Sequence, residues 1–112
     1  MAKEKTEEEV RNQFLKHALG LVDYWASVKG RTEKEKISGA IFSILVLLDG
    51  GTELPEFLVI PNPHPSDKEY NIENDKDWFP QVPDDIHNKV YNIGGCLHEY
   101  FSRMEVKGDE DE

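Results

Sequence analysis

The chain has 112 residues and a mass of 12.9 kDa, and we expect residues 1–112 to form a single domain with charged, frayed ends at 1–6 and 105–112. Its 13 basic residues against 23 acidic ones give a net charge of -10, which argues against binding to nucleic acid or anionic lipid. The single cysteine, Cys96, excludes an internal disulfide and a cysteine-rich zinc module. No segment has the roughly 18 apolar residues of a membrane span, so we expect no membrane partner and a cytoplasmic location.

The first predicted helix covers residues 7–29. Thr6 provides a hydroxyl cap, and acidic residues fill the first turn, where the positive end of the helix dipole favours them. Apolar residues then recur at steps of three and four from Val10 to Val28. This spacing is typical of an amphipathic helix that ends before Gly30.

The second predicted helix covers residues 33–49 and opens with a capping-box pattern, Thr32 followed by Glu35. From Ile41 to Leu48 it has almost no polar face. Such a helix must be buried on nearly every side, and two further helices of the same chain offer too little surface to cover it. We therefore expect a homo-oligomer.

A short strand and a third helix complete the expected fold, which is mainly α with a minor β element. The run 57–60 is prone to form a strand but has no second run to pair with. We therefore expect it to pair with irregular backbone or with another subunit. Apolar steps of three and four predict one helix over 84–104, interrupted or kinked at Gly94 and Gly95. The expected core comprises Trp25, Ile41, Ile44, Leu45, Leu48, Ile93 and Leu97.

Between the strand and the third helix lies a connection of residues 60–83, with prolines at 61, 63 and 65 and one expected helical turn capped by Ser66. Its aromatic anchors favour an ordered loop over a disordered one. Amide, carboxylate and aromatic groups gather there, a mixture typical of ligand sites. The candidate binding residues of this loop are Asn62, His64, Asp67, Lys68, Tyr70 and Trp78. The alternative is that the polar residues only make turns while the aromatics cover the helices.

One basic cluster stands out in this acidic chain, around the start of the second helix. It contains Lys29, Arg31, Lys34 and Lys36, which could hold an anion near the helix N-terminus while a base ring stacks on Trp78 or Tyr70. The alternative is that Glu33 and Glu35 neutralise the cluster and leave a solvated face.

Catalytic and metal-binding patterns are weak. No glycine elbow, phosphate-binding glycine loop or HExxH motif occurs. Neither His64 with Asp67 nor His98 with Glu99 has a diagnostic ligand spacing, and we expect Cys96 to be a small buried residue. We predict no catalytic residue, metal or cofactor, and an enzyme remains the least supported reading.

Three segments resemble a group of small uncharacterised bacteriophage and prophage proteins. These segments are 37–50, 61–70 and 93–98, within a resemblance that spans about residues 30–104. The resemblance implies a context in which small proteins act on the host cell, including its immune systems. Two strategies fit a chain of this size: a sponge that traps a nucleotide signal, and an acidic protein that blocks a host enzyme, sometimes by imitating DNA.

Two functions follow as hypotheses. The first is a non-catalytic oligomeric protein that sequesters a nucleotide-type small molecule. The second is an acidic interaction module or inhibitor that meets a basic host protein through surface carboxylates.

Overall fold

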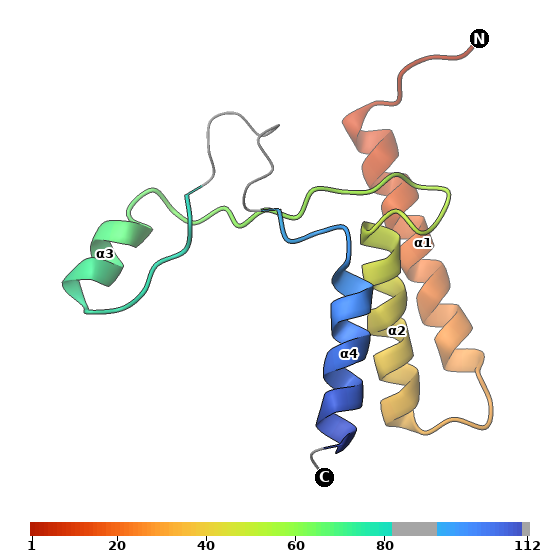
Figure 1. Ribbon diagram of the computed structural model, residues 1–112. Helices are drawn as coiled ribbons and strands as arrows, with labels where there is room; N and C mark the ends of the chain where they lie inside the picture. The colour runs from red at the N-terminus through yellow and green to blue at the C-terminus, as the bar shows by residue number, and fades with distance from the viewer. Residues whose placement is uncertain (82–91, 111–112) are drawn as a thin grey trace.

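The computed structural model describes residues 1–81 and 92–110, with side chains described up to residue 105. Four helices form this part of the chain: α1 (Glu7–Ser27), α2 (Glu33–Leu48), α3 (Asp67–Glu73) and α4 (Leu97–Glu110) (Figure 1). The expected mainly α fold is confirmed. The expected strand is absent from the described residues, and a short fourth helix accompanies the three longer ones.

Both predicted helix starts have the expected caps. In α1 the Glu9 N–H donates to Thr6 Oγ1 at 3.1 Å, and the Glu9 carboxylate accepts from the Thr6 N–H. In α2 Thr32 and Glu35 form the same reciprocal pair, with both bonds 3.1 Å long. The Thr32 N–H, followed by the Arg31 guanidinium, lowers the pKa of Glu35. Local sequence therefore sets both N-termini.

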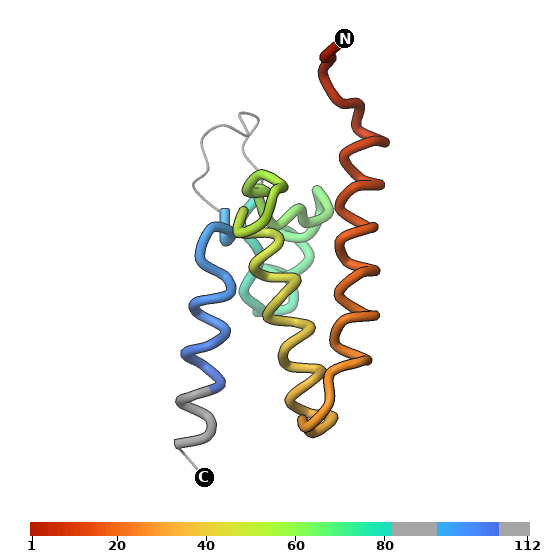
Figure 2. Tube along the Cα trace, turned by 90° about the vertical axis from the view of Figure 1, so that its right-hand side faces the viewer, coloured from red at the N-terminus to blue at the C-terminus, as the bar shows by residue number. Residues whose placement is uncertain are grey.

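Helices α1, α2 and α4 form one antiparallel layer with α2 in the middle. In the described part of the chain α2 contacts α1 on one side and α4 on the other, whereas α1 and α4 do not touch (Figures 1 and 2). A closed three-helix bundle would bring all three pairs into contact and enclose a core between them. This layer instead leaves α2 uncovered on part of its surface.

The contact between α1 and α2 depends on Trp25. Its Nε1 donates to Ser43 Oγ at 3.0 Å, and Ser43 Oγ donates to the Gly39 carbonyl at 2.8 Å. A Cβ built at Gly39 would lie 2.4 Å from the indole ring. The indole ring thus packs directly against the α2 backbone, and only glycine at position 39 leaves room for this contact.

Replacing Gly39 with alanine should therefore destabilise the protein, although alanine is the better helix former by about 1 kcal/mol. The new methyl displaces the indole, and such overpacking costs about 1–3 kcal/mol. Urea unfolding measures the change. Gly20→Ala is the matched control, because nothing lies within 4 Å of a Cβ at that α1 position, and it should stabilise the chain by up to about 1 kcal/mol. Equal shifts in the two variants would contradict the packing role.

Asp49 joins the end of α2 to the start of α4. Its Oδ1 accepts from the Gly95 N–H at 2.9 Å, and its Oδ2 accepts from the His98 N–H at 2.9 Å and lies 2.5 Å from His98 Nδ1. The carboxylate is only 1% exposed. Burial alone would raise the pKa of Asp49, but these hydrogen bonds together outweigh it and hold the pKa below its usual value. Asp49 therefore caps α4 from another helix.

Helix α4 corresponds to the third predicted helix and begins later in the sequence than predicted. Of the predicted range 84–104, residues 84–91 lie outside the described residues, and 92–96 are not helical. Gly95 has a φ of +104°, which ends any continuous helix there. A Cβ on Gly94 would lie 2.9 Å from the Phe57 carbonyl oxygen. Gly95 therefore breaks the helix, and Gly94 allows the backbone at Phe57 to approach closely. Helix α4 begins only at Leu97.

The predicted strand 57–60 is wrong, because the groups that hydrogen-bond to this segment do not belong to a second strand. The Val59 N–H donates to Asn92 Oδ1 at 2.8 Å, and the Val59 carbonyl accepts from the Ile93 N–H at 2.8 Å. One partner is a side chain and the next is a single backbone amide, so no ladder forms. Pairing with irregular backbone was one of the two outcomes expected for a lone strand.

The described part of the long loop, residues 60–81, carries α3 on an arm. The chain leaves the layer along the proline-rich segment 61–65, and Figure 1 places α3 well apart from the other helices. In the described residues α3 contacts no other helix. The predicted Ser66 cap is wrong in detail, because Ser66 Oγ pairs with His64 Nδ1 at 2.8 Å and leaves the helix without a side-chain cap.

The core differs most from expectation. Among the described residues the buried apolar side chains are Leu47 and Leu54, whereas the expected core residues Ile41 and Ile93 are exposed. Trp25, Ile44, Leu45, Leu48 and Leu97 are only partly buried. The chain exposes 9252 Å², against about 6,300 Å² for a compact protein of this mass. Its radius of gyration is 18.0 Å, against about 13 Å for a compact domain.

Candidate functional site

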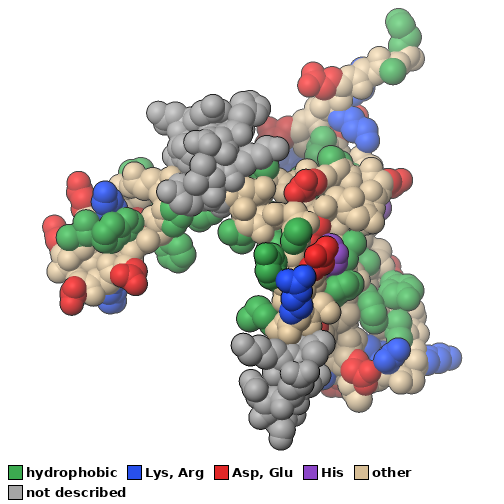
Figure 3. Space-filling model, in the orientation of Figure 1, with side chains coloured by type: hydrophobic (Ala, Val, Ile, Leu, Met, Phe, Trp, Pro, Cys, Tyr) green, Lys and Arg blue, Asp and Glu red, His purple; other side chains and the backbone are tan. Residues whose placement is uncertain are grey.

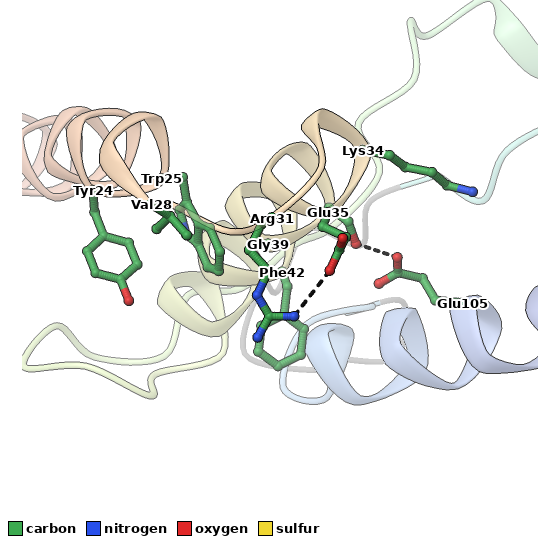
Figure 4. Close-up of a pocket in the computed structure, with 10 residues that line it drawn as sticks. Tyr24, Trp25, Val28, Arg31, Lys34, Glu35, Gly39, Phe42 and Glu105 are labelled. Atoms are coloured by element: carbon green, nitrogen blue, oxygen red, sulfur yellow. Dashed lines mark hydrogen bonds and ion pairs between the residues drawn. The ribbon is translucent and has the colours of Figure 1, made fainter.

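A pocket of about 610 Å³ lies at the foot of the helical layer, where the C-terminal end of α1 meets the start of α2 (Figure 4). The turn between these helices and Glu105 of α4 complete its wall. Its lining residues are Tyr24, Trp25, Val28, Arg31, Lys34, Glu35, Ser38, Gly39, Phe42 and Glu105.

Aromatic rings form one part of the pocket. Tyr24 and Trp25 come from the last turns of α1 and meet edge to face, with ring centroids 5.2 Å apart. Phe42 comes from α2, and its ring meets His98 of α4 edge to face at 5.6 Å. These side chains present flat apolar surfaces of the kind on which a planar ring can stack.

Charged groups form the other part. The Arg31 guanidinium donates to Glu35 at 3.1 Å, an ion pair drawn in Figure 4. Ser38 Oγ donates to Glu105, which links α2 to α4 across the pocket floor. Lys34 has no ion-pair partner among the described residues. The site therefore combines cations for an anionic group with carboxylate and hydroxyl oxygens for hydroxyl or amino groups.

Of the predicted basic cluster, the structure brings Arg31 and Lys34 into this pocket, and Lys29 does not line it. The Arg31 to Glu35 pair fits the alternative expectation that Glu35 neutralises part of the cluster. Lys34 is left as the freer of the two cations.

The predicted loop residues lie on the arm and do not line the pocket. These are Asn62, His64, Asp67, Lys68, Tyr70 and Trp78. Lys68 Nζ lies 5.6 Å from the Trp78 ring centroid, and Asp67 accepts hydrogen bonds from two further residues of the arm, from the Asn71 side chain and from the Phe79 N–H. These polar groups therefore hold the arm together. Trp78 and the basic cluster do not line a common pocket in one chain, so a ligand held by the cluster would not stack on Trp78 of the same chain.

Sequence reasoning missed the aromatic half of the pocket. Trp25 was assigned to the core because it lies on the apolar stripe of α1, although a tryptophan at the last turn of a helix, six residues before Arg31, is also close to the basic turn. Glu105 fell in the expected frayed end. Only tertiary packing brings it to the pocket, and no local signal marks it.

Other candidate chemistry receives little geometric support. Among the described side chains, those of residues 1–81 and 92–105, no three His, Cys, Asp or Glu groups are placed so as to hold a metal ion. Cys96 was expected to be buried and is exposed, because the turn before α4 turns it outward. None of the described helices has the length and apolar character to cross a membrane.

Comparison of the chain with protein-family models, with curated proteins and with solved structures finds no match.

Proposed function

We propose that this protein is a non-catalytic binding protein that works as a homo-oligomer and captures a nucleotide-type small molecule in the pocket at the foot of its helical layer. In the phage setting that the sequence resembles, such a protein would sequester a nucleotide signal of host immunity.

The ligand proposal is supported by one observation: cationic and aromatic side chains line the same cavity. Arg31 and Lys34 can meet a phosphate, and Trp25 or Tyr24 can stack on a base. Glu105 and Ser38 suit ribose hydroxyls or an exocyclic amine. The net charge of -10 repels an anion at long range, but salt screens that repulsion beyond about 8 Å and local donors decide binding.

The oligomer is supported by the surface that the single chain leaves open. Large apolar side chains on α1, α2 and α4 contribute to it, among them Leu19, Ile41 and Met104. Monomers rarely leave such surface in water, whereas obligate subunits bury it against one another.

Thermal unfolding in the presence of cyclic dinucleotides, cyclic oligonucleotides and ADP-ribose derivatives tests the ligand proposal. A ligand at 100 times its dissociation constant should stabilise the protein by about 2.7 kcal/mol. The double variant Arg31→Ala, Lys34→Ala should lose the shift. Lys29→Ala removes a charge from the same turn without touching the pocket and should keep it. Released ligand should be chemically unchanged, and a silent panel would contradict the proposal.

The second candidate, an acidic module that binds a basic host protein, is favoured by the charge of -10 and by the acidic arm, where Glu69, Glu73, Asp75 and Asp77 lie close to exposed aromatic rings. Its binding should weaken steeply as salt rises, because exposed charges are screened. A single basic protein recovered from host lysate at low salt and lost at high salt, together with a silent nucleotide panel, would favour this function over the first.

A further inference from the structure

The charged residues that line the pocket balance one another. Arg31 and Lys34 supply positive charge and Glu35 and Glu105 supply an equal negative charge, so the described lining is neutral as a whole. Near the turn that joins α1 to α2, basic and acidic side chains lie side by side on the surface (Figure 3). A cleft lined by one sign of charge attracts ligands of the opposite sign. This neutral lining gives no such preference for a highly charged anion.

Glu35 balances the charge of Arg31. The guanidinium donates to Glu35 Oε2 at 3.1 Å, and Glu35 Oε1 accepts from the Thr32 N–H at 3.1 Å. The Thr32 N–H, followed by the Arg31 guanidinium, lowers the pKa of Glu35, so this carboxylate is ionised at neutral pH. Figure 4 shows Arg31 directed at Glu35 within the pocket. Arg31 therefore keeps N–H groups to donate to a ligand, but its positive charge is already compensated.

Lys34 is the remaining cation of the lining. Among the described residues it has no ion-pair partner. Figure 4 shows its ammonium group directed away from Arg31, so the two cations do not close on one point as a clamp for a doubly charged group would. Across the pocket, Glu105 accepts from Ser38 and repels further negative charge. The lining can thus compensate a single negative charge of a ligand.

Phosphate groups differ in the charge that they carry. A phosphodiester has a single negative charge, whereas a terminal phosphate carries about -1.5 to -2 at pH 7. We propose that Glu35 is a specificity-determining residue that restricts the pocket to nucleotides linked through phosphodiesters, as in cyclic dinucleotides and cyclic oligonucleotides. Terminal phosphates and diphosphates are disfavoured, because Glu35 occupies the second cation that they need. The inference rests on the proposed nucleotide-binding function and names the class of nucleotide.

Three matched probes test this restriction: a cyclic dinucleotide, the linear dinucleotide of the same bases, and that linear dinucleotide with a 5′-phosphate. An adenine set and a guanine set are used, because charge does not specify the base. Isothermal titration calorimetry at neutral pH and physiological salt gives the Kd of each probe. The wild-type protein should bind the cyclic form, and the 5′-phosphate should weaken the binding of the linear form. A lining with an excess of cations would give the opposite order.

Glu35→Gln removes the negative charge and keeps the local structure, because glutamine also completes a capping box. The variant frees the charge of Arg31 and should bind the 5′-phosphorylated probe about tenfold more tightly, with a smaller change for the other two. Glu9→Gln is the matched control, since it makes the same change in the capping box of α1. Glu9 lies roughly 20 Å along the helix from Tyr24, well beyond the screening distance of about 8 Å. It should leave all three affinities unchanged.

The outcomes separate this inference from the proposed function. Weaker binding of the 5′-phosphorylated probe than of its unphosphorylated form, with a selective gain in Glu35→Gln, supports the inference. Equal or tighter binding of the phosphorylated probe by the wild-type protein, or an equal gain for both linear forms in Glu35→Gln, overturns the inference and keeps the proposed function.

Two further results are also decisive. If only the cyclic form binds to the wild-type protein, a gain of the phosphorylated linear form alone in Glu35→Gln supports the inference, and no gain overturns it. No binding of any adenine or guanine probe, by the wild-type protein or the variant, overturns both proposals. Circular dichroism and urea unfolding of each variant show that the helices are retained.

Discussion

Replacing Asp49 with alanine should lower the free energy of unfolding by roughly 3 kcal/mol, a large part of the stability of a small domain. The carboxylate is almost wholly buried and accepts from the backbone of Gly95 and from the backbone and ring of His98. Its removal leaves those donors without an acceptor and uncaps α4. Urea unfolding gives the value. Asp23→Ala, at an exposed acid of α1, should change stability by less than about 0.5 kcal/mol.

The same residue predicts a pH dependence. The folded-state pKa of Asp49 lies below its unfolded value of about 3.9. Its stabilisation is therefore complete above that pH and is lost as the pH falls through the folded-state pKa. The stability difference between the wild-type protein and Asp49→Asn should shrink as the pH falls below about 4. A difference that grows on acidification would contradict this role.

Placing aspartates at Leu19 and Ile41 together should weaken self-association by a factor of about 1,000 or more, equivalent to about 4 kcal/mol. Leu19 lies with Leu15 and Val22 on an exposed apolar stripe of α1, and Ile41 lies with Ile37 on one of α2; we call these two stripes the outer face. An unpaired charge buried in an apolar contact is strongly unfavourable. Neither side chain is buried within its own chain, so helicity should be retained. Light scattering measures the mass.

The control for that variant is Tyr24→Asp, an exposed aromatic on the pocket side of α1. It introduces the same charge and should leave the mass of the assembly unchanged. Dissociation by Tyr24→Asp alone, or an unchanged mass in the Leu19, Ile41 variant, would show that the outer face is not the interface.

Local sequence was sufficient to predict the parts of the fold that depend on neighbouring residues. The hydroxyl cap at Thr6 and the capping box of Thr32 with Glu35 form as expected, because each depends on residues no more than three positions apart. The start of α4 depends on Asp49, which is 46 residues from its partner Gly95, and the apolar spacing that continues through Gly94 and Gly95 conceals the break. A long-range cap has no signature in a local pattern.

The candidate site divides in the same way. Charge alone identified Arg31 and Lys34, because they cluster in an acidic chain. Trp25 was assigned to the core by helical spacing, which says that a residue faces a neighbouring helix but not how deeply it is covered. The expectation of a partner for α2 came from its lack of polar residues, and the exposure of Ile37 and Ile41 in the isolated chain is consistent with it.

Sedimentation equilibrium of the full chain over micromolar concentrations at physiological salt is the most direct test of the central claim that this protein functions as an assembled subunit. The chain mass is 12.9 kDa. We predict a stable species of at least twice that mass, since the large apolar side chains that one chain leaves exposed need a second chain to cover them. A single species of 12.9 kDa at every concentration would contradict the account.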